Sequence, residues 1–153
     1  MNYKIEIITE MASTEIQEGA TKAAQTVLEL ESAASGSLSI LLTDEKALQQ
    51  ANRKYAGIDQ PTDVLSFADG EQLPGEDDIY YGDIMIATPI AERQARIGNH
   101  SLHDEICLLT IHGVLHLLGY DHNDTRSKDA MWSRQEAALL AMGIDPGIVK
   151  EQE

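Results

Sequence analysis

Three histidines with the spacing of metal ligands lie close together in the chain. His112, His116 and His122 fall within eleven residues. Residues four apart share one face of a helix, so His112 and His116 would stand side by side, one turn apart. Gly119 can adopt the left-handed conformation that ends a helix, and the chain could then turn back and bring His122 to the same point. Three neutral imidazoles with an open fourth position describe a catalytic zinc site, so we expect one zinc ion per chain.

This spacing also matches the long zinc signature of the metzincin proteases, H-E-x-x-H-x-x-G-x-x-H, at every fixed position except one. Where those proteases have the glutamate that acts as general base, this chain has Gly113. The sequence therefore predicts a metal site without the base of a protease, which argues against peptide hydrolysis by the usual mechanism. Nickel, cobalt or copper would also be accepted by three imidazoles.

The carboxylates nearest to the histidines leave the general base unassigned. Asp121 and Asp124 can each orient a histidine or serve the turn that they lie in, and both interpretations stay open. Glu105 lies on the helix face of the first histidine but about two turns, roughly 10 Å, away. We expect it to be a solvated carboxylate near the start of the helix. His100 and His103 are expected at the surface.

Other polar residues have an ordinary structural interpretation beside a functional one. Thr62 and Ser66 suit turn and strand hydrogen bonds, or the wall of a cleft. Arg93 and Arg96 suit a solvated helix face, or a patch that contacts phosphate. Cys107 is expected to be a buried small apolar residue and not a ligand.

The composition limits the class of protein. The 153 residues include 26 acidic and 11 basic ones, for a net charge of −15, which does not favour broad nucleic-acid binding because phosphate contacts need Lys and Arg. The few basic residues can still gather in one cleft. A single cysteine excludes an internal disulfide and fits a reducing cytosol. With no apolar run that could cross a bilayer and no secretory signal, we expect a soluble, cytoplasmic protein without a membrane partner.

Hydrophobic periodicity predicts one domain, residues 1–153, whose elements follow the order β-α-β-α-β-β-α-α-α. The expected strands cover residues 3–9, 37–43, 64–67 and 79–88, with an acidic loop at 68–78. The expected helices cover residues 14–32 with Thr14 as cap, a short stretch from a cap at 43 or 44 to Gly57, and then 90–97, 102–118 and 125–143. This order predicts an α+β fold, a four-stranded mixed sheet with packed helices. Helix 102–118 is apolar on most sides and should be buried, so packing would hold the metal site on it and on the following turn.

Three blocks of the chain resemble the YbeY family of bacterial single-strand-specific endoribonucleases, from about Asn52 onward. Residues 112–122 match the family pattern H-G-x-L-H-L-x-G-Y-D-H, residues 61–67 match P-T-D-V-L-S-F, and residues 82–86 match G-D-I-x-I. The resemblance implies a zinc-dependent nuclease whose metal-binding and catalytic residues are His112, His116 and His122. It also implies a role in 16S rRNA 3′-end maturation and ribosome quality control. The implied partners are single-stranded RNA, rRNA and ribosomal proteins or the small subunit.

One position departs from the family pattern N-x-x-Y-R. Asn52 and Tyr55 match it, but Ala56 replaces the arginine that the family is thought to use for the RNA phosphate. Two alternatives therefore stand beside the nuclease. One is a metal hydrolase of another class, a peptidase or an esterase, against which Gly113 argues. The other is a zinc-stabilised ribosome assembly factor with little intrinsic nuclease activity, which the net charge of −15 and Ala56 favour.

Overall fold

The computed structural model describes residues 2–72 and 78–149 and confirms the α+β class. In chain order the elements are β1 (Tyr3–Thr9), α1 (Thr14–Leu30), β2 (Gly36–Thr43), α2 (Glu45–Ala56), β3 (Val64–Gln72), β4 (Ile79–Ala87), α3 (Thr88–Gly98), α4 (Leu102–Leu117), α5 (Thr125–Ala141) and the short 3₁₀ helix η1 (Pro146–Ile148). The order of strands and α-helices is the predicted one, and η1 is the one addition within the described residues.

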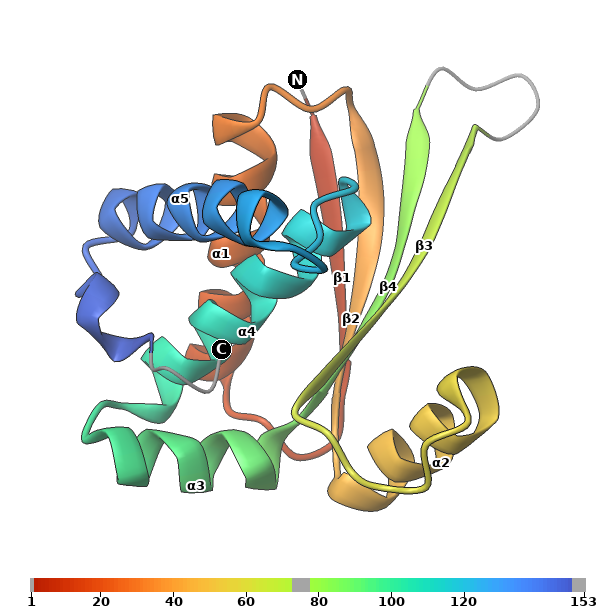
Figure 1. Cartoon of the computed structure of the whole chain (residues 1–153), viewed down its shortest axis with the longest axis vertical. Helices are drawn as coiled ribbons and strands as arrows, with labels where there is room; N and C mark the ends of the chain where they lie inside the picture. Colours follow the sequence, from red (N-terminus) through yellow and green to blue (C-terminus); the bar gives the residue numbers. More distant parts are fainter. Residues whose placement is uncertain (1, 73–77, 150–153) are drawn as a thin grey trace.

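The sheet is mixed, with strand order β1-β2-β4-β3. β1 pairs with β2 and β2 with β4 in parallel, whereas β3 runs antiparallel to β4 and forms an edge of the sheet. Figure 1 shows α1, α4 and α5 layered on one side of the sheet and α2 on the other side, near one end. α4 contacts both β3 and β4, so the helix that carries two histidines lies directly against the edge strand.

Strand β3 is longer than predicted, and the expected loop at 68–78 is wrong for residues 68–72. Those residues continue β3, with Ala68 opposite Gly82 and Gln72 opposite Ile79 on β4. Their sequence lacks an apolar alternation, but backbone hydrogen bonds to a neighbouring strand do not need one. An edge strand also tolerates polar residues well. Residues 73–77 of that prediction lie outside the described residues, and Asp78 precedes β4 without belonging to a strand, as predicted.

Local capping signals decide where the helices begin and end. The N-cap of α1 is Ser13, whose hydroxyl accepts from the backbone N–H of Ile16, so the predicted cap at Thr14 is wrong by one residue. Asp44 caps α2 as predicted, with its carboxylate accepting from the backbone of Ala47. Gly57 ends α2 in the left-handed conformation, at φ 72°.

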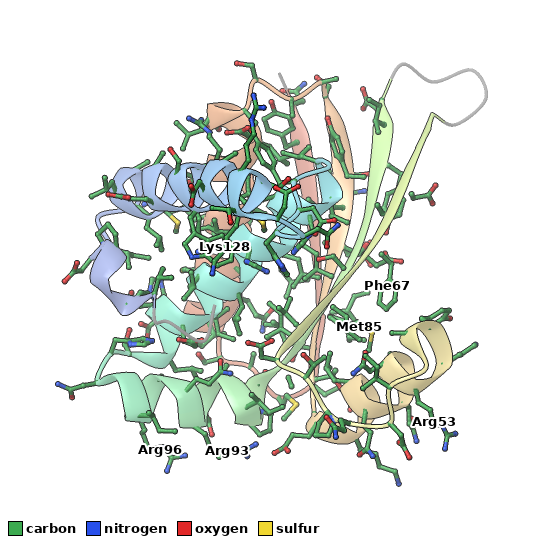
Figure 2. The ribbon with its side chains drawn as sticks, in the orientation of Figure 1. Arg53, Phe67, Met85, Arg93, Arg96 and Lys128 are labelled. Atoms are coloured by element: carbon green, nitrogen blue, oxygen red, sulfur yellow. The ribbon has the colours of Figure 1, made fainter. Side chains whose placement is uncertain are left out.

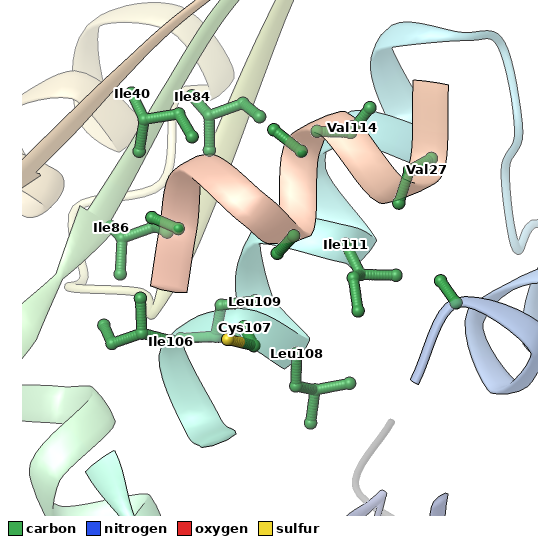
Figure 3. Packing of buried hydrophobic residues seen from close by; sticks show 14 of the residues in the cluster. Val27, Ile40, Ile84, Ile86, Ile106, Cys107, Leu108, Leu109, Ile111 and Val114 are labelled. Atoms are coloured by element: carbon green, nitrogen blue, oxygen red, sulfur yellow. The ribbon is translucent and has the colours of Figure 1, made fainter. Parts of the chain in front are cut away.

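α4 is the centre of the core. Figure 3 shows its apolar residues surrounded by side chains of α1, β2 and β4. Cys107 is fully buried among them, as predicted. Burial of a leucine or isoleucine side chain is worth about 1.5–3 kcal/mol, so packing on several sides fixes the helix in place. The fully buried large side chains of α4 are Ile106, Leu109, Ile111 and Leu115, with Leu108 at 2% exposure.

No helix within the described residues is both long and apolar enough to cross a membrane. α4 has 16 residues, which span roughly 24 Å at 1.5 Å per residue. A bilayer's hydrocarbon core is about 30 Å thick.

Candidate metal centre

The first two histidines of the cluster come from the last two turns of α4. Ser101 caps this helix, and its hydroxyl accepts from the backbone N–H of Asp104 at 3.0 Å. His112 and His116 therefore lie one turn apart on the same face. Their Nε2 atoms are 3.2 Å apart. The rest of the helix surface is occupied by core packing, so the two rings have little freedom to separate.

Gly113 lies where α4 approaches the sheet most tightly. A Cβ atom there would lie 3.0 Å from Cγ2 of Ile84 and 3.1 Å from the hydroxyl of Ser66. That hydroxyl donates a hydrogen bond to the carbonyl of Gly113 at 3.1 Å. The position that carries the glutamate in the protease signature thus faces the sheet here and has no room for a long side chain. The structure gives a packing reason for the departure from that signature.

The third histidine is brought back by the turn that ends α4. The backbone N–H of Tyr120 donates to the carbonyl of Leu115, and that of Gly119 donates to His116, as in a Schellman motif. Gly119 has φ 100°, a conformation that glycine adopts without strain. The chain then reverses, and the ring of His122 lies 5.1 Å from that of His116, centroid to centroid.

The three imidazoles fit a metal ion by geometry and by donor type. One ligand nitrogen from each of His112, His116 and His122 lies within 4.8 Å of the other two. Two nitrogens bound at 2.0–2.1 Å to a tetrahedral ion would be roughly 3.3 Å apart. The 3.2 Å between the Nε2 atoms of His112 and His116 is close to that value. The cluster can therefore hold a metal ion, with His122 on the exposed turn as its outermost member.

Burial keeps His112 in the protonation state that a metal needs. It lowers the pKa of His112 to about 4, and the neighbouring His116 and His122 act in the same direction. Burial and the nearby His122 also lower the pKa of His116. Neutral imidazole is the metal-binding form. At neutral pH the protein therefore does not have to remove a proton from His112 to bind a cation.

Two of the three rings have a hydrogen-bonding partner on the side away from the cluster. Nδ1 of His112 lies 3.0 Å from Oε1 of Gln135 on α5. The ring of His116 hydrogen-bonds to the backbone of Tyr120. The contact with Gln135 favours a proton on Nδ1 of His112 and a lone pair on its Nε2. Nε2 of His112 and Nε2 of His116 lie within hydrogen-bonding distance of each other, at 3.2 Å, and a cation between them would need a lone pair on both.

Asp121 and Asp124 have turn and cap contacts, so the structure favours the turn interpretation for both. The carboxylate of Asp121 accepts from the backbone N–H of His122 and from the side chain of Asn123, both at 2.7 Å. Asp124 caps α5 through the backbone N–H of Ser127. The histidine partner that the structure does show, Gln135, was not predicted.

A cleft of about 580 Å³ opens over the three histidines. Its opposite wall is the edge strand β3 and the segment before it, including Thr62, Asp63 and Ser66. Thr62 and Ser66 both line this cleft, and each hydroxyl also donates a hydrogen bond, to Asp63 and to the carbonyl of Gly113 respectively, so both of their interpretations hold. An edge strand as a wall leaves the cleft open along one side, which suits an extended substrate.

The segment that leads into this wall is held by two side chains. Asn52 is buried in α2, and its amide donates to the carbonyl of Gln60 at 3.0 Å. Gln94 of α3 donates to the carboxylate of Asp63 at 3.3 Å. The amide of Asn52 therefore supports the loop that follows α2, and Gln94 supports the cleft wall itself.

Two expectations about residues at or just before the start of α4 are wrong. His100 and Glu105 are not solvated: their side chains are 7% and 5% exposed, and Nε2 of His100 lies 2.6 Å from Oε1 of Glu105. Burial raises the pKa of the Glu105 carboxyl, partly offset by its hydrogen bond to His100. The pair joins the end of α3 to the start of α4. His103 is one-third exposed and lies outside the histidine cluster.

The two arginines of α3 do not reach the cleft. Figure 2 shows Arg93 and Arg96 pointing outward from the side of α3 away from the sheet, and Arg53 pointing outward from α2. Arg93 pairs with Glu45 of α2 at 2.6 Å. The solvated-face interpretation of Arg93 and Arg96 is therefore the one that the structure supports.

Comparison with known proteins gives a consistent result. The sequence profile of the family Endoribonuclease YbeY matches residues 2–143. A protein named Endoribonuclease YbeY from Gloeobacter violaceus is 42% identical over 124 residues, which cover 78% of this chain and 64% of that protein. Its namesake from Moorella thermoacetica is 44% identical over 130 residues, covering 77% and 83%. The solution structure of TM1509 from Thermotoga maritima superposes with a TM-score of 0.61 and 25% identity, covering 96% of this chain and 97% of that one.

Proposed function

The chain belongs to the YbeY family of endoribonucleases, and on that premise we propose that it is a zinc-dependent endoribonuclease for single-stranded RNA. His112, His116 and His122 are the proposed metal ligands and catalytic residues, with one zinc ion per chain. The observation that carries the proposal is the convergence of three imidazoles at the base of an open cleft.

In this proposal the histidines and the cleft wall have separate roles. The imidazoles hold the cation without adding negative charge, so the cation keeps its full charge. When bound, it supplies Lewis-acid activation of water and of a phosphoryl oxygen. The edge-strand wall with Thr62, Asp63 and Ser66 positions the RNA backbone over the cluster. Because Gly113 packs against the sheet, a glutamate cannot take part from that position as it does in proteases.

We further propose 16S rRNA 3′-end maturation and ribosome quality control as the cellular role, with ribosomal proteins or the small subunit as partners. The net charge of −15 supports this because it suits docking to basic ribosomal proteins. The single cysteine fits a reducing cytoplasm, where rRNA is processed.

A second candidate is a zinc-stabilised ribosome assembly factor with little intrinsic nuclease activity. Ala56 favours it, since this exposed position follows Tyr55 at the end of α2 and carries no positive charge for an RNA phosphate. Arg53 and Lys54 are exposed nearby on the same helix, but Figure 2 shows Arg53 pointing outward.

The deciding experiment is cleavage of a single-stranded RNA by the purified chain and by His116→Ala, with the metal content of both measured. The nuclease proposal expects about one zinc per wild-type chain, and loss of both zinc and cleavage in the variant. His103→Ala is the matched control, because it removes another histidine from the same helix outside the cluster. Cleavage by zinc-free His116→Ala would overturn the metal mechanism. Zinc without cleavage in the wild type would favour the assembly factor.

A further inference from the structure

α5 reaches the metal centre through a buried amide. Gln135 is 1% exposed and lies on the face of α5 that also carries Met131, Ala138 and Leu139, all buried. A polar side chain in a buried apolar stripe needs a partner, because an unpaired buried amide is costly. Its Oε1 lies 3.0 Å from Nδ1 of His112. The one polar group of this stripe therefore contacts a candidate ligand.

We propose that Gln135 is a positioning residue that selects the metal-binding tautomer of His112. A carbonyl oxygen can only accept, so the proton of the neutral ring must be on Nδ1. The lone pair is then on Nε2, the atom that faces His116. This inference rests on the proposed function only in taking the three histidines as metal ligands.

Without this acceptor, the neutral ring of His112 has an alternative. Its proton can move to Nε2 and be donated to Nε2 of His116, 3.2 Å away. That arrangement would pair the two Nε2 atoms and leave the lone pair of His112 on Nδ1, on the side away from the other two histidines. Because Gln135 accepts the proton on Nδ1, it disfavours this tautomer and keeps the lone pair on Nε2, where a cation can bind.

In many metal sites a carboxylate accepts the hydrogen bond from the outer ring nitrogen of a ligand histidine, whereas in this chain an amide does so. An acceptor of either type fixes the tautomer, but a glutamate would add a negative charge and favour the imidazolium. Gln135 orients the ring and leaves its charge unchanged. The hydrogen bond of Gln135 and the charge that a glutamate would add are therefore separate effects, and two substitutions can distinguish them.

The first measurement is zinc affinity, from competition with a chelating dye. Gln135→Met removes the acceptor at similar volume and should weaken zinc binding by about 10–100-fold. Gln135→Glu keeps the acceptor and should bind zinc at least as tightly as the wild type. Gln17→Met is the control, because this glutamine of α1 also makes a hydrogen bond, to the carbonyl of Ala12. It should leave zinc affinity unchanged.

The second measurement is the ¹⁵N NMR signature of the imidazoles in the metal-free wild type, which needs no substitution. His112 should show a protonated Nδ1 and an unprotonated Nε2 at neutral pH. A proton on Nε2, or unchanged zinc affinity in a folded Gln135→Met, would overturn the inference. Neither readout uses RNA, so a failed cleavage assay would refute the nuclease and leave this result standing.

Discussion

Replacing Gly113 with alanine would test whether α4 is seated against the sheet as tightly as the contacts indicate. The added Cβ would lie 3.0 and 3.1 Å from two methyl carbons of Ile84 and 3.1 Å from the hydroxyl of Ser66. Alanine gains about 1 kcal/mol over glycine in a helix interior. Overpacking a filled core costs about 1–3 kcal/mol.

We expect the packing cost to win, because the contacts come from two strands and Ile84 is fully buried. Subtracting the helix gain from the packing cost leaves a net loss of up to about 2 kcal/mol, which lowers the melting temperature by up to about 8 °C in a chain of this size. Thermal unfolding of the metal-free protein measures it. Zinc affinity should fall as well, because any shift of α4 moves His112 and His116 relative to His122.

A double-mutant cycle tests whether the contact between positions 113 and 84 causes this loss of stability. Ile84→Val removes Cδ1, one of the two methyl carbons in the way, and alone should cost about 0.5–1.5 kcal/mol. In the Gly113→Ala background it should cost at least 0.5 kcal/mol less, as expected for residues in contact. Strict additivity, or a Gly113→Ala protein more stable than the wild type by the full helix propensity, would show that space remains between α4 and the sheet.

Three further predictions follow from the site. Because burial lowers the pKa of His112 from 6.5 to about 4, its folded form binds fewer protons than the unfolded chain. Stability of the metal-free protein should therefore fall as pH drops from about 6.5 to 4, by up to roughly 3 kcal/mol, and His112→Asn should flatten this slope in unfolding measured with a chelator present. Asn52→Ala removes the hydrogen bond to Gln60 and should cost about 1–2 kcal/mol in denaturant unfolding; an unchanged midpoint would mean that this bond does not hold the loop. Ala56→Arg restores the charge of the family pattern and should lower the KM for single-stranded RNA without raising stability by more than about 0.5 kcal/mol, while an unchanged KM would place position 56 outside the RNA path.

Much of the fold could be predicted because local signals agreed with tertiary packing. The alternation in β1 and the caps at Asp44, Gly57 and Ser101 act within a few residues of where they lie in the sequence. The histidine cluster could also be anticipated, since helix spacing brings His112 and His116 together and the glycine turn adds His122.

Long-range contacts account for the features that the sequence did not predict. Residues 68–72 became strand because β4 offers them hydrogen-bonding partners, which their own sequence does not reveal. Glu105 looked like a solvated carboxylate because its partner, His100, precedes the helix and folds back onto it. Gln135 had a detectable signal, a lone amide in an apolar stripe, but its partner lies 23 residues away on another helix.

The Gln135 contact has a consequence for the order in which the centre is assembled. α4 alone supplies two of the three imidazoles, whereas His122 lies after its end and the amide that orients His112 comes from α5. A chain whose α5 has not yet docked therefore has all three imidazoles but lacks the acceptor that orients one of them. If Gln135 orients His112 as proposed, the affinity for a cation would stay lower until α5 has docked.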